Sequence, residues 1–252
     1  TDVSIYKWTD TVAKEYAPHF PLVLGHEMSG VIIEIGSNVK KFKIGDHIAV
    51  NEHIFCGTCE QCLAGRTCIC EKRYILGCHI NGAMTEYMVV RQQNCFKLPE
   101  SVPHYAGSIA EPISVAVHAV ERVPANPGDI AVVYGVGTIG LALCIVLLEA
   151  GATVIAVGIQ NDSMRLKLAE EFGAIPVCIE QENNQDVLAE LHKLDASGAD
   201  ICYECSGAPN ALNSALSVIK PDGVVGQVGM PPINISIDVC GQIVFKEKSI
   251  VG

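Results

Sequence analysis

The segment Val132–Gly140 (V-V-Y-G-V-G-T-I-G) decides the fold, because a short apolar run breaks there into the pattern G-x-G-x-x-G. It is followed by an apolar segment, Leu141–Ala150, and by a second apolar run, Thr153–Val157. A strand, a tight glycine turn and a helix bring backbone N–H groups and a helix N-terminus to the pyrophosphate of a dinucleotide. Glycine turns also serve as plain links between a strand and a helix, so that alternative stays open. The flanking elements favour a dinucleotide-binding turn.

Strand and helix signals alternate along the chain from Ile130 onward. The expected strands are Ile130–Tyr134, Thr153–Val157, Pro176–Ile179, Asp200–Glu204, Gly223–Val228 and Ser249–Gly252. The expected helices are Leu141–Ala150, Ser163–Phe172, Gln185–Lys193 and Asn210–Val218, with a less regular segment at Val239–Phe245. This alternation predicts an α/β fold with a doubly wound parallel sheet of the Rossmann type.

The chain before this region has a different pattern. Short apolar runs bounded by turn residues predict strands at Gly30–Ile35, Asp46–Asn51 and Met84–Val90, and a partly buried helix is expected at His104–Val123. The proline- and glycine-rich stretch Pro124–Asp129 is the best candidate for a linker. We therefore expect two domains, a β-rich domain over residues 1–123 and a dinucleotide-binding domain over residues 124–252.

Composition narrows the functional classes and the compartment. The chain has 252 residues and a net charge of −11, which argues against nucleic acid or an anionic membrane as a partner. No apolar stretch approaches the length of a membrane span, and no signal peptide opens the chain. Five of the twelve cysteines fall within Cys56–Cys70 and the others are scattered through apolar strands. This distribution indicates a metal site and reduced thiols, hence a cytoplasmic protein.

The cysteine-rich loop has the spacing of a metal site, Cys56-x2-Cys59-x2-Cys62-x7-Cys70. Four thiolates around one tetrahedral ion favour a structural zinc, whose binding would supply the folding energy of a polar loop. The alternative is a set of unpaired surface thiols, which would be a liability for a cytoplasmic protein. Cys68 is a fifth candidate ligand that spacing alone does not separate from Cys70.

These pieces together resemble the zinc-dependent medium-chain alcohol dehydrogenases, in the order of that family and over essentially the whole chain. The motifs that carry the resemblance are Gly25-His26-Glu27 with Ser29-Gly30, Gly45-Asp46, Cys56-Gly57-x-Cys59-x-x-Cys62, Glu86-Tyr87, Glu111-Pro112 and the glycine turn. Within the family, Thr1-Asp2-Val3, Tyr6-Lys7-Trp8 and Glu111-Pro112 resemble the polyol (sorbitol/L-iditol) and threonine 3-dehydrogenase branch. The resemblance implies a catalytic zinc between a GroES-like domain and a Rossmann domain.

The resemblance also implies residue roles at the catalytic zinc. His26 and Glu27 would be ligands, Glu111 would lie at or near the metal, and the Thr1 hydroxyl would pass a proton outward. The family's cysteine ligand would lie two residues before Thr1, and its first strands and C-terminal segment are not in this sequence. We therefore expect a fragment with an incomplete GroES-like domain, a catalytic site that binds zinc weakly, and little activity. The resemblance selects Cys70 as the fourth structural ligand.

The residues alone leave other interpretations of this site open. Adjacent side chains of a regular strand face opposite ways, so His26 and Glu27 can share an ion only in irregular backbone, which Gly25 makes plausible. His26 is otherwise a core histidine, and Glu111 a helix-capping or ion-paired carboxylate.

A nicotinamide cofactor, NAD or NADP, is expected to bind the dinucleotide-binding domain. Its expected contacts are Gly135, Val136, Gly137, Thr138, Ile139, Gly140, Gly158, Arg165, Ser206, Val228 and Gly229. The second strand of such a fold usually ends in an acidic residue that binds the ribose and disfavours a 2′-phosphate, but here it ends in Gly158. Asp162 lies beyond that position and is expected to cap the helix from Ser163. Both NAD and NADP remain possible cofactors.

The expected function is hydride transfer between NAD(P) and a secondary alcohol on a small polar substrate, with a polyol such as sorbitol or iditol preferred. L-threonine 3-dehydrogenase is the alternative, although that branch often carries histidine where this chain has Ser4. A catalytically inactive nucleotide-binding fragment is the alternative from another class. We expect a homodimer or homotetramer, because Ser249–Gly252 would be an edge strand open to pairing with a second copy.

Overall fold

The computed structural model describes residues 1–10, 16, 18–180 and 184–252. The chain divides into two compact units, Thr1–Glu111 and Pro112–Gly252. Helix α4 (Ala110–Arg122) begins at this division, earlier than the linker that the sequence suggests. Most of this helix belongs to the second unit, because Ala116 packs in the core of that unit. Val123, which follows the helix, packs in the same core. Among the described residues, no helix combines the length and apolar character needed to cross a membrane.

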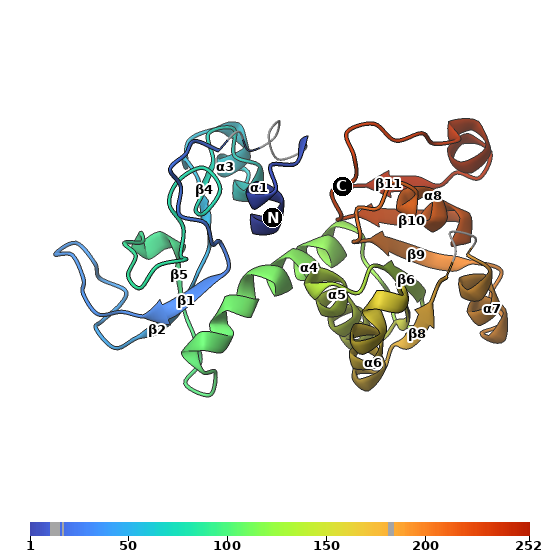
Figure 1. The fold of residues 1–252 in the computed structure, drawn as a ribbon, viewed down its shortest axis with the longest axis horizontal. Coiled ribbons are helices and arrows are strands. Elements are labelled where there is room, and N and C mark those ends of the chain that lie inside the picture. The colour runs from blue at the N-terminus through green and yellow to red at the C-terminus, as the bar shows by residue number, and fades with distance from the viewer. Residues whose placement is uncertain (11–15, 17, 181–183) are drawn as a thin grey trace. The chain divides into compact units, whose positions relative to one another are not determined.

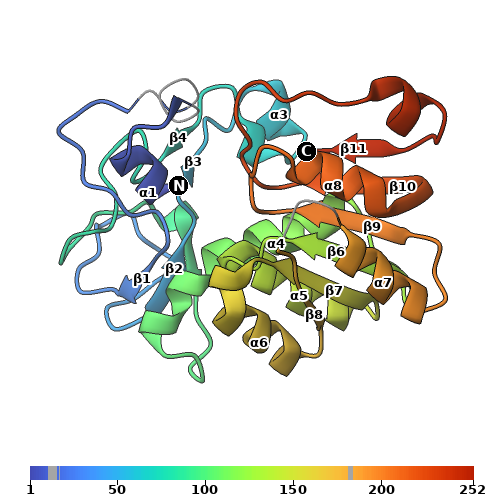
Figure 2. The same ribbon diagram turned by 45° about the vertical axis from the view of Figure 1, so that its right-hand side comes forward.

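The first unit contains short antiparallel strands (Figures 1 and 2). Strand β2 (His47–Val50) lies between β1 (Met28–Val31) and β5 (Cys95–Lys97), and pairs with both in antiparallel fashion. A second small sheet joins β3 (His53–Ile54) and β4 (Tyr74–Ile75). The helical segments are α1 (Asp2–Tyr6), α3 (Glu60–Leu63), η1 (Thr67–Ile69), η2 (Gln92–Asn94) and η3 (His104–Ile109).

The strand predictions for this unit were only partly right. The strand expected at Gly30–Ile35 starts earlier and stops at Val31, and the strand expected at Met84–Val90 does not form. Apolar alternation describes side chains, but a strand also needs a partner backbone. Among the described residues, the chain at 84–90 donates one backbone hydrogen bond to a distant segment, from Met84 N to Leu24 O, and one locally, from Thr85 N to Ala83 O. Strand β5 was not anticipated, because three residues are too few to show a period.

The second unit is a six-stranded sheet in the order β11-β10-β9-β6-β7-β8. All five strand pairs are parallel, as the strand and helix alternation predicts. The strands are β6 (Ile130–Tyr134), β7 (Thr153–Gly158), β8 (Ile175–Cys178), β9 (Ala199–Glu204), β10 (Ile219–Gln227) and β11 (Ser249–Val251). The helical segments are α5 (Thr138–Glu149), η4 (Gln160–Asp162), α6 (Ser163–Phe172), α7 (Gln185–Lys193), α8 (Ala211–Val218) and the π-helical η5 (Val239–Val244).

Apolar layers cover both faces of this sheet, so the predicted doubly wound fold is confirmed. One layer joins Val133 of β6 to α5 and α6 residues such as Leu143 and Leu166. The other joins the neighbouring Val132 to residues of α7 and α8. Successive side chains of a strand point to opposite faces, and a strand buried on both faces therefore has a continuous apolar sequence.

The order of the strands reverses within the sheet. The chain proceeds from β6 outward to β7 and β8, and then crosses to β9 on the other side of β6. Ligands of doubly wound sheets bind outside the carboxyl ends of the strands where the order reverses in this way. In this protein that point lies between β6 and β9, where the glycine turn follows Tyr134.

Candidate metal centres and dinucleotide site

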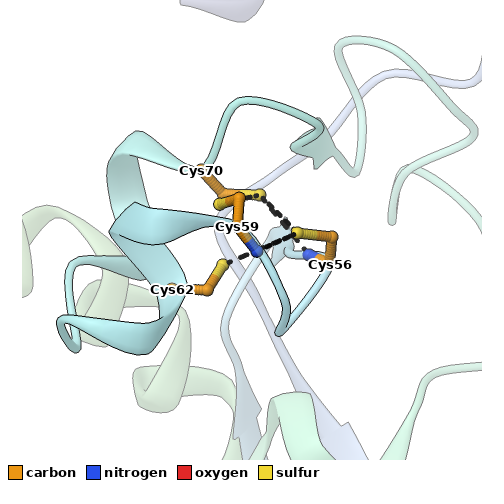
Figure 3. A group of neighbouring side chains, drawn as sticks. All are labelled: Cys56, Cys59, Cys62 and Cys70. Atoms are coloured by element: carbon orange, nitrogen blue, oxygen red, sulfur yellow. Dashed lines mark hydrogen bonds between the residues drawn. The ribbon is translucent and has the colours of Figure 1, made fainter.

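Four cysteines of one loop meet in the first unit. Their sulfur atoms all lie within 4.8 Å of one another, and Figure 3 shows the side chains converging from the loop and from α3. The segment 56–70 contains five cysteines, and the four that form this group are Cys56, Cys59, Cys62 and Cys70. Cys68, which spacing left open, lies on η1 outside this group.

The distances between these sulfur atoms fit a tetrahedral ion. Zn–S bonds of about 2.3 Å place tetrahedral sulfur atoms about 3.8 Å apart. The sulfur of Cys56 lies 3.9 Å from that of Cys62 and 3.6 Å from that of Cys70, and Cys59 and Cys70 are 3.8 Å apart. The residues present therefore fit a structural zinc.

Backbone donors and mutual repulsion also indicate a cation at this loop. The N–H groups of Thr58 and Cys59 point at the sulfur of Cys56 and lower its pKa to about 6. Burial and the neighbouring thiols raise the pKa of Cys62 to about 12. Four sulfurs of this kind ionise together only when a positive ion lies among them, since a coordinated thiol is deprotonated.

A second group of possible ligands, also in the first unit, contains His26, Glu27 and Glu111. One ligand atom from each lies within 4.8 Å of the others. His26 and Glu27 come just before β1, in backbone without regular structure, so the alternation of a strand does not separate their side chains. Glu111 stands in the first turn of α4.

Glycines allow the irregular backbone at this site. Gly25 has φ of +101°, in the left-handed region that side chains disfavour. The chain packs closely there: side-chain carbons at Gly77 and Gly82 would lie 2.4 and 2.1 Å from the carbonyl oxygen of Gly25. The Gly25 carbonyl also accepts a hydrogen bond from Ala83 N at 2.9 Å. Three glycines thus hold His26 at a fixed place.

Carboxylates surround His26 on more than one side. The Nδ1 atom of His26, a side chain that is 7% exposed, lies 2.8 Å from Oδ2 of Asp2, and the other Asp2 oxygen accepts from Gly25 N. Burial and the carboxylates of Glu52 and Glu27 together raise the pKa of Glu111 to about 7. This concentration of acidic groups around an imidazole fits a divalent cation. Asp2 and Glu52 were not expected here, because their approach to His26 and Glu111 is not a sequence pattern.

Thr1 lies beside Asp2 at the start of α1. Its side chain is exposed and hydrogen-bonds the phenol of Tyr16. The structure therefore brings Asp2, rather than Thr1, against His26.

The glycine turn of the second unit has three glycines with three different environments. Gly135 has φ of +91°, and a side-chain carbon there would lie 2.8 Å from Ser206 N. A side-chain carbon at Gly140 would lie only 1.8 Å from the carbonyl oxygen of Gly135, whereas one at Gly137 would meet nothing within 4 Å. The first and third glycines therefore serve packing, and the second leaves open space where a phosphate can approach.

The helix after this turn presents its N-terminus without a side-chain cap. Gly137 is the N-cap of α5, and Thr138 and Ile139 begin its first turn. Uncapped N–H groups at a helix N-terminus attract anions. Val136, only 1% exposed, belongs to the apolar core, so only its backbone is placed to meet a cofactor.

The end of β7 is Gly158, with Asp162 and Arg165 following it. A side-chain carbon at Gly158 would lie 2.9 Å from Val136 Cγ2. Asp162 binds Ile159 N at 3.2 Å and Arg165 Nη1 at 2.8 Å. Asp162 precedes α6 as expected, but its carboxylate makes no cap hydrogen bond to that helix, since it binds the preceding turn and Arg165 instead.

The other expected cofactor residues, Ser206, Val228 and Gly229, all bind Glu204, which was not among the residues expected from the sequence. Val228 N and Gly229 N donate to the main-chain oxygen of Glu204 at 2.9 and 2.7 Å. Ser206 N and Oγ donate to its carboxylate at 2.6 and 2.5 Å. Glu204 ends β9 and is completely buried. An acidic residue at the end of an apolar strand is the feature of the sequence that could have indicated a functional role for Glu204.

Comparisons with known proteins agree with both units. Residues 1–100 match the alcohol dehydrogenase GroES-like domain, and residues 138–252 match the zinc-binding dehydrogenase domain. A curated relative, the L-threonine 3-dehydrogenase of Pseudoalteromonas translucida, is 36% identical over all of this chain and 72% of its own length. The chain belongs to the zinc-dependent medium-chain alcohol dehydrogenase family. The predicted family and its oxidoreductase class are thus confirmed.

Solved structures of similar proteins support the same assignment for this dehydrogenase. Galactitol-1-phosphate dehydrogenase from Escherichia coli is 31% identical, with a TM-score of 0.84 over 93% of this chain and 68% of that one. A zinc-binding dehydrogenase from Sinorhizobium meliloti bound to NADP is 30% identical, with a TM-score of 0.86 over 96% and 71%. A protein described as a short chain alcohol dehydrogenase from Escherichia coli CFT073, complexed with NADH, is 27% identical, with a TM-score of 0.84 over 99% and 70%.

Proposed function

We propose that this dehydrogenase moves a hydride between NAD or NADP and a secondary alcohol that carries a polar group on a neighbouring carbon. The observation that carries the proposal is the His26–Glu27–Glu111 group, a cation site of one histidine and two carboxylates. The chain that contains it also has a complete glycine turn at the reversal of a doubly wound sheet. Structures similar to this chain hold NADP and NADH, which supports a nicotinamide cofactor without favouring either.

The chain's own residues have separate tasks in this proposal. His26, Glu27 and Glu111 would hold the catalytic zinc, and the Asp2 carboxylate, 2.8 Å from Nδ1 of His26, adds negative charge beside this imidazole. When bound, zinc supplies Lewis acidity toward the substrate hydroxyl and the nicotinamide accepts the hydride. Thr1, exposed and hydrogen-bonded to Tyr16, is the proposed residue that passes the released proton to solvent.

We propose a polyol as the first substrate class. Glu27, Glu52 and Glu111 make the surroundings of His26 strongly acidic, and a neutral polyol brings no further negative charge to them. Similarity to galactitol-1-phosphate dehydrogenase supports a polyol carbon chain, and the phosphate named there is a difference from the neutral polyol proposed here. L-Threonine is the second candidate, because the curated relative described above is an L-threonine 3-dehydrogenase. Both substrates present a secondary hydroxyl beside a polar group.

The test is turnover by the natural protein that carries this chain, loaded with zinc. Sorbitol, L-iditol, galactitol and L-threonine are each offered with NAD and with NADP, and nucleotide reduction is followed by absorbance. We expect oxidation of at least one polyol, and loss of about 100-fold or more in kcat/KM when His26 is changed to Ala. Tight nucleotide binding without turnover of any alcohol would support an inactive nucleotide-binding protein instead. Preference for L-threonine would select the second candidate.

A further inference from the structure

Glu204 lies at the centre of the carboxyl edge of the Rossmann sheet. It is the last residue of β9, and its backbone is in register with Tyr134 of β6 on one side and Gln227 of β10 on the other. The strand order reverses between β6 and β9. Its side chain therefore stands at the point where a doubly wound sheet receives its ligand.

The carboxylate of Glu204 is fully buried and receives five hydrogen bonds. Oε1 accepts from Ser206 N at 2.6 Å, Ser206 Oγ at 2.5 Å and Gly207 N at 2.9 Å. Oε2 accepts from Gln227 Nε2 at 2.6 Å and from Gly207 N at 3.2 Å. Glu204 is 0% exposed. Among the described residues, no lysine, arginine or histidine forms an ion pair with it.

Such an arrangement is unusual for a residue with only a packing role. A buried charge without a counter-ion is unfavourable unless hydrogen bonds replace its water shell. Here the donors come from the segment that follows β9 and from Gln227, the last residue of β10. The charge therefore depends on these residues keeping one conformation, and they in turn depend on the charge.

The segments that follow β9 and β10 pack closely on each other, and the first of them packs on the glycine turn. A side-chain carbon at Gly229 would lie 2.4 Å from Gly207 N and 2.6 Å from Oε2 of Glu204. One at Gly207 would lie 2.6 Å from the carbonyl oxygen of Met230, and one at Gly135 would lie 2.8 Å from Ser206 N. A small displacement of Ser206–Gly207 thus reaches the glycine turn directly, and a displacement at Gly229–Met230 reaches it through Gly207.

We propose that Glu204 is a positioning residue for the cofactor, and this inference rests on the proposed dehydrogenase function. Its carboxylate binds Ser206 and Gly207 directly and also holds the side-chain amide of Gln227, which donates to Gly229 O as well. Through these contacts it fixes the wall that receives the nicotinamide half of the dinucleotide. The adenosine half belongs to the other part of the sheet, where β7 ends at Gly158. Loss of the carboxylate should therefore weaken binding of the whole dinucleotide more than binding of its adenosine half.

The test compares NADH, NADPH and AMP as ligands of the unsubstituted chain and of Glu204→Gln, by isothermal titration calorimetry. The substituted amide replaces one acceptor with a donor that faces the donors of Ser206, Gly207 or Gln227. We expect the dissociation constant of the preferred dinucleotide to rise about tenfold or more, and that of AMP to change less than about twofold. Asp200→Asn is the matched control, because Asp200 stands on the same strand, binds Ile130 N and pairs with Lys220.

If the unsubstituted chain binds no nicotinamide nucleotide, the proposed function fails. If it binds and Glu204→Gln binds NADH, NADPH and AMP as before, or loses all of them in proportion, the positioning role of Glu204 is wrong. Should Glu204→Gln fail to fold, Gln227→Met removes a single donor to Oε2 and should weaken dinucleotide binding selectively. Unchanged binding by Gln227→Met would then refute the inference.

Discussion

Substitution of two glycines in the same turn should separate folding from cofactor binding. In Gly140→Ala the new carbon would lie 1.8 Å from the carbonyl oxygen of Gly135. Ordinary contact between carbon and oxygen needs about 3.3 Å, so the helix and the turn must move apart by about 1.5 Å. Overpacking of this kind costs about 1–3 kcal/mol. In Gly137→Ala the new carbon would meet nothing within 4 Å.

The two variants should differ in stability and in nucleotide affinity. A loss of about 2 kcal/mol lowers the melting temperature by about 4–8 °C in a chain of this size. Gly137→Ala should change stability by less than about 0.5 kcal/mol, because the weaker N-cap is offset by lower entropy of the unfolded chain. It should nevertheless raise the dissociation constant for NADH or NADPH about tenfold or more, since the methyl group occupies the approach of the pyrophosphate.

The assay pairs thermal unfolding by circular dichroism with calorimetric titration of the nucleotide, with zinc present throughout. An unchanged melting temperature in Gly140→Ala would show that the close approach of the helix tolerates a side chain, contrary to the expected loss of stability. Equal destabilisation by Gly137→Ala and Gly140→Ala, or unweakened dinucleotide binding by Gly137→Ala, would contradict the open space assigned to Gly137.

Three further predictions concern metal, cofactor and assembly. One zinc ion per chain should survive in Cys68→Ser and be lost in Cys70→Ser, as measured by elemental analysis; equal zinc content in both variants would contradict the assigned ligands. NADP should bind at least as well as NAD, because no acidic residue ends β7 at Gly158; a strong NAD preference that persists in Asp162→Ala would show otherwise. The chain should form a homodimer through the edge strand β11, and Ile250→Lys should weaken it in light scattering; a monomer at micromolar concentration without any substitution would rule this out.

Much of the Rossmann unit could be predicted because its signals are local. The strands around Val132 and Ile155 are buried on both faces, so each has a continuous apolar run bounded by turn residues. Boundaries moved by a few residues: α5 begins at Thr138 and β10 at Ile219, both earlier than expected. The first unit was harder to predict, because its strands are short and their existence depends on partners far along the chain.

The sequence by itself determined the doubly wound sheet, the glycine turn and the cysteine loop, since each is encoded within a short stretch by apolar period, backbone freedom or ligand spacing. Only the tertiary structure decided which side chains meet across long separations. It placed Asp2 against His26, and it surrounded the buried Glu204 with donors from the segment after β9 and from Gln227 at the end of β10. The physical reason is the same in each case: a buried charge or ligand is stabilised by the donors that the fold brings to it, and local periodicity carries no record of those partners.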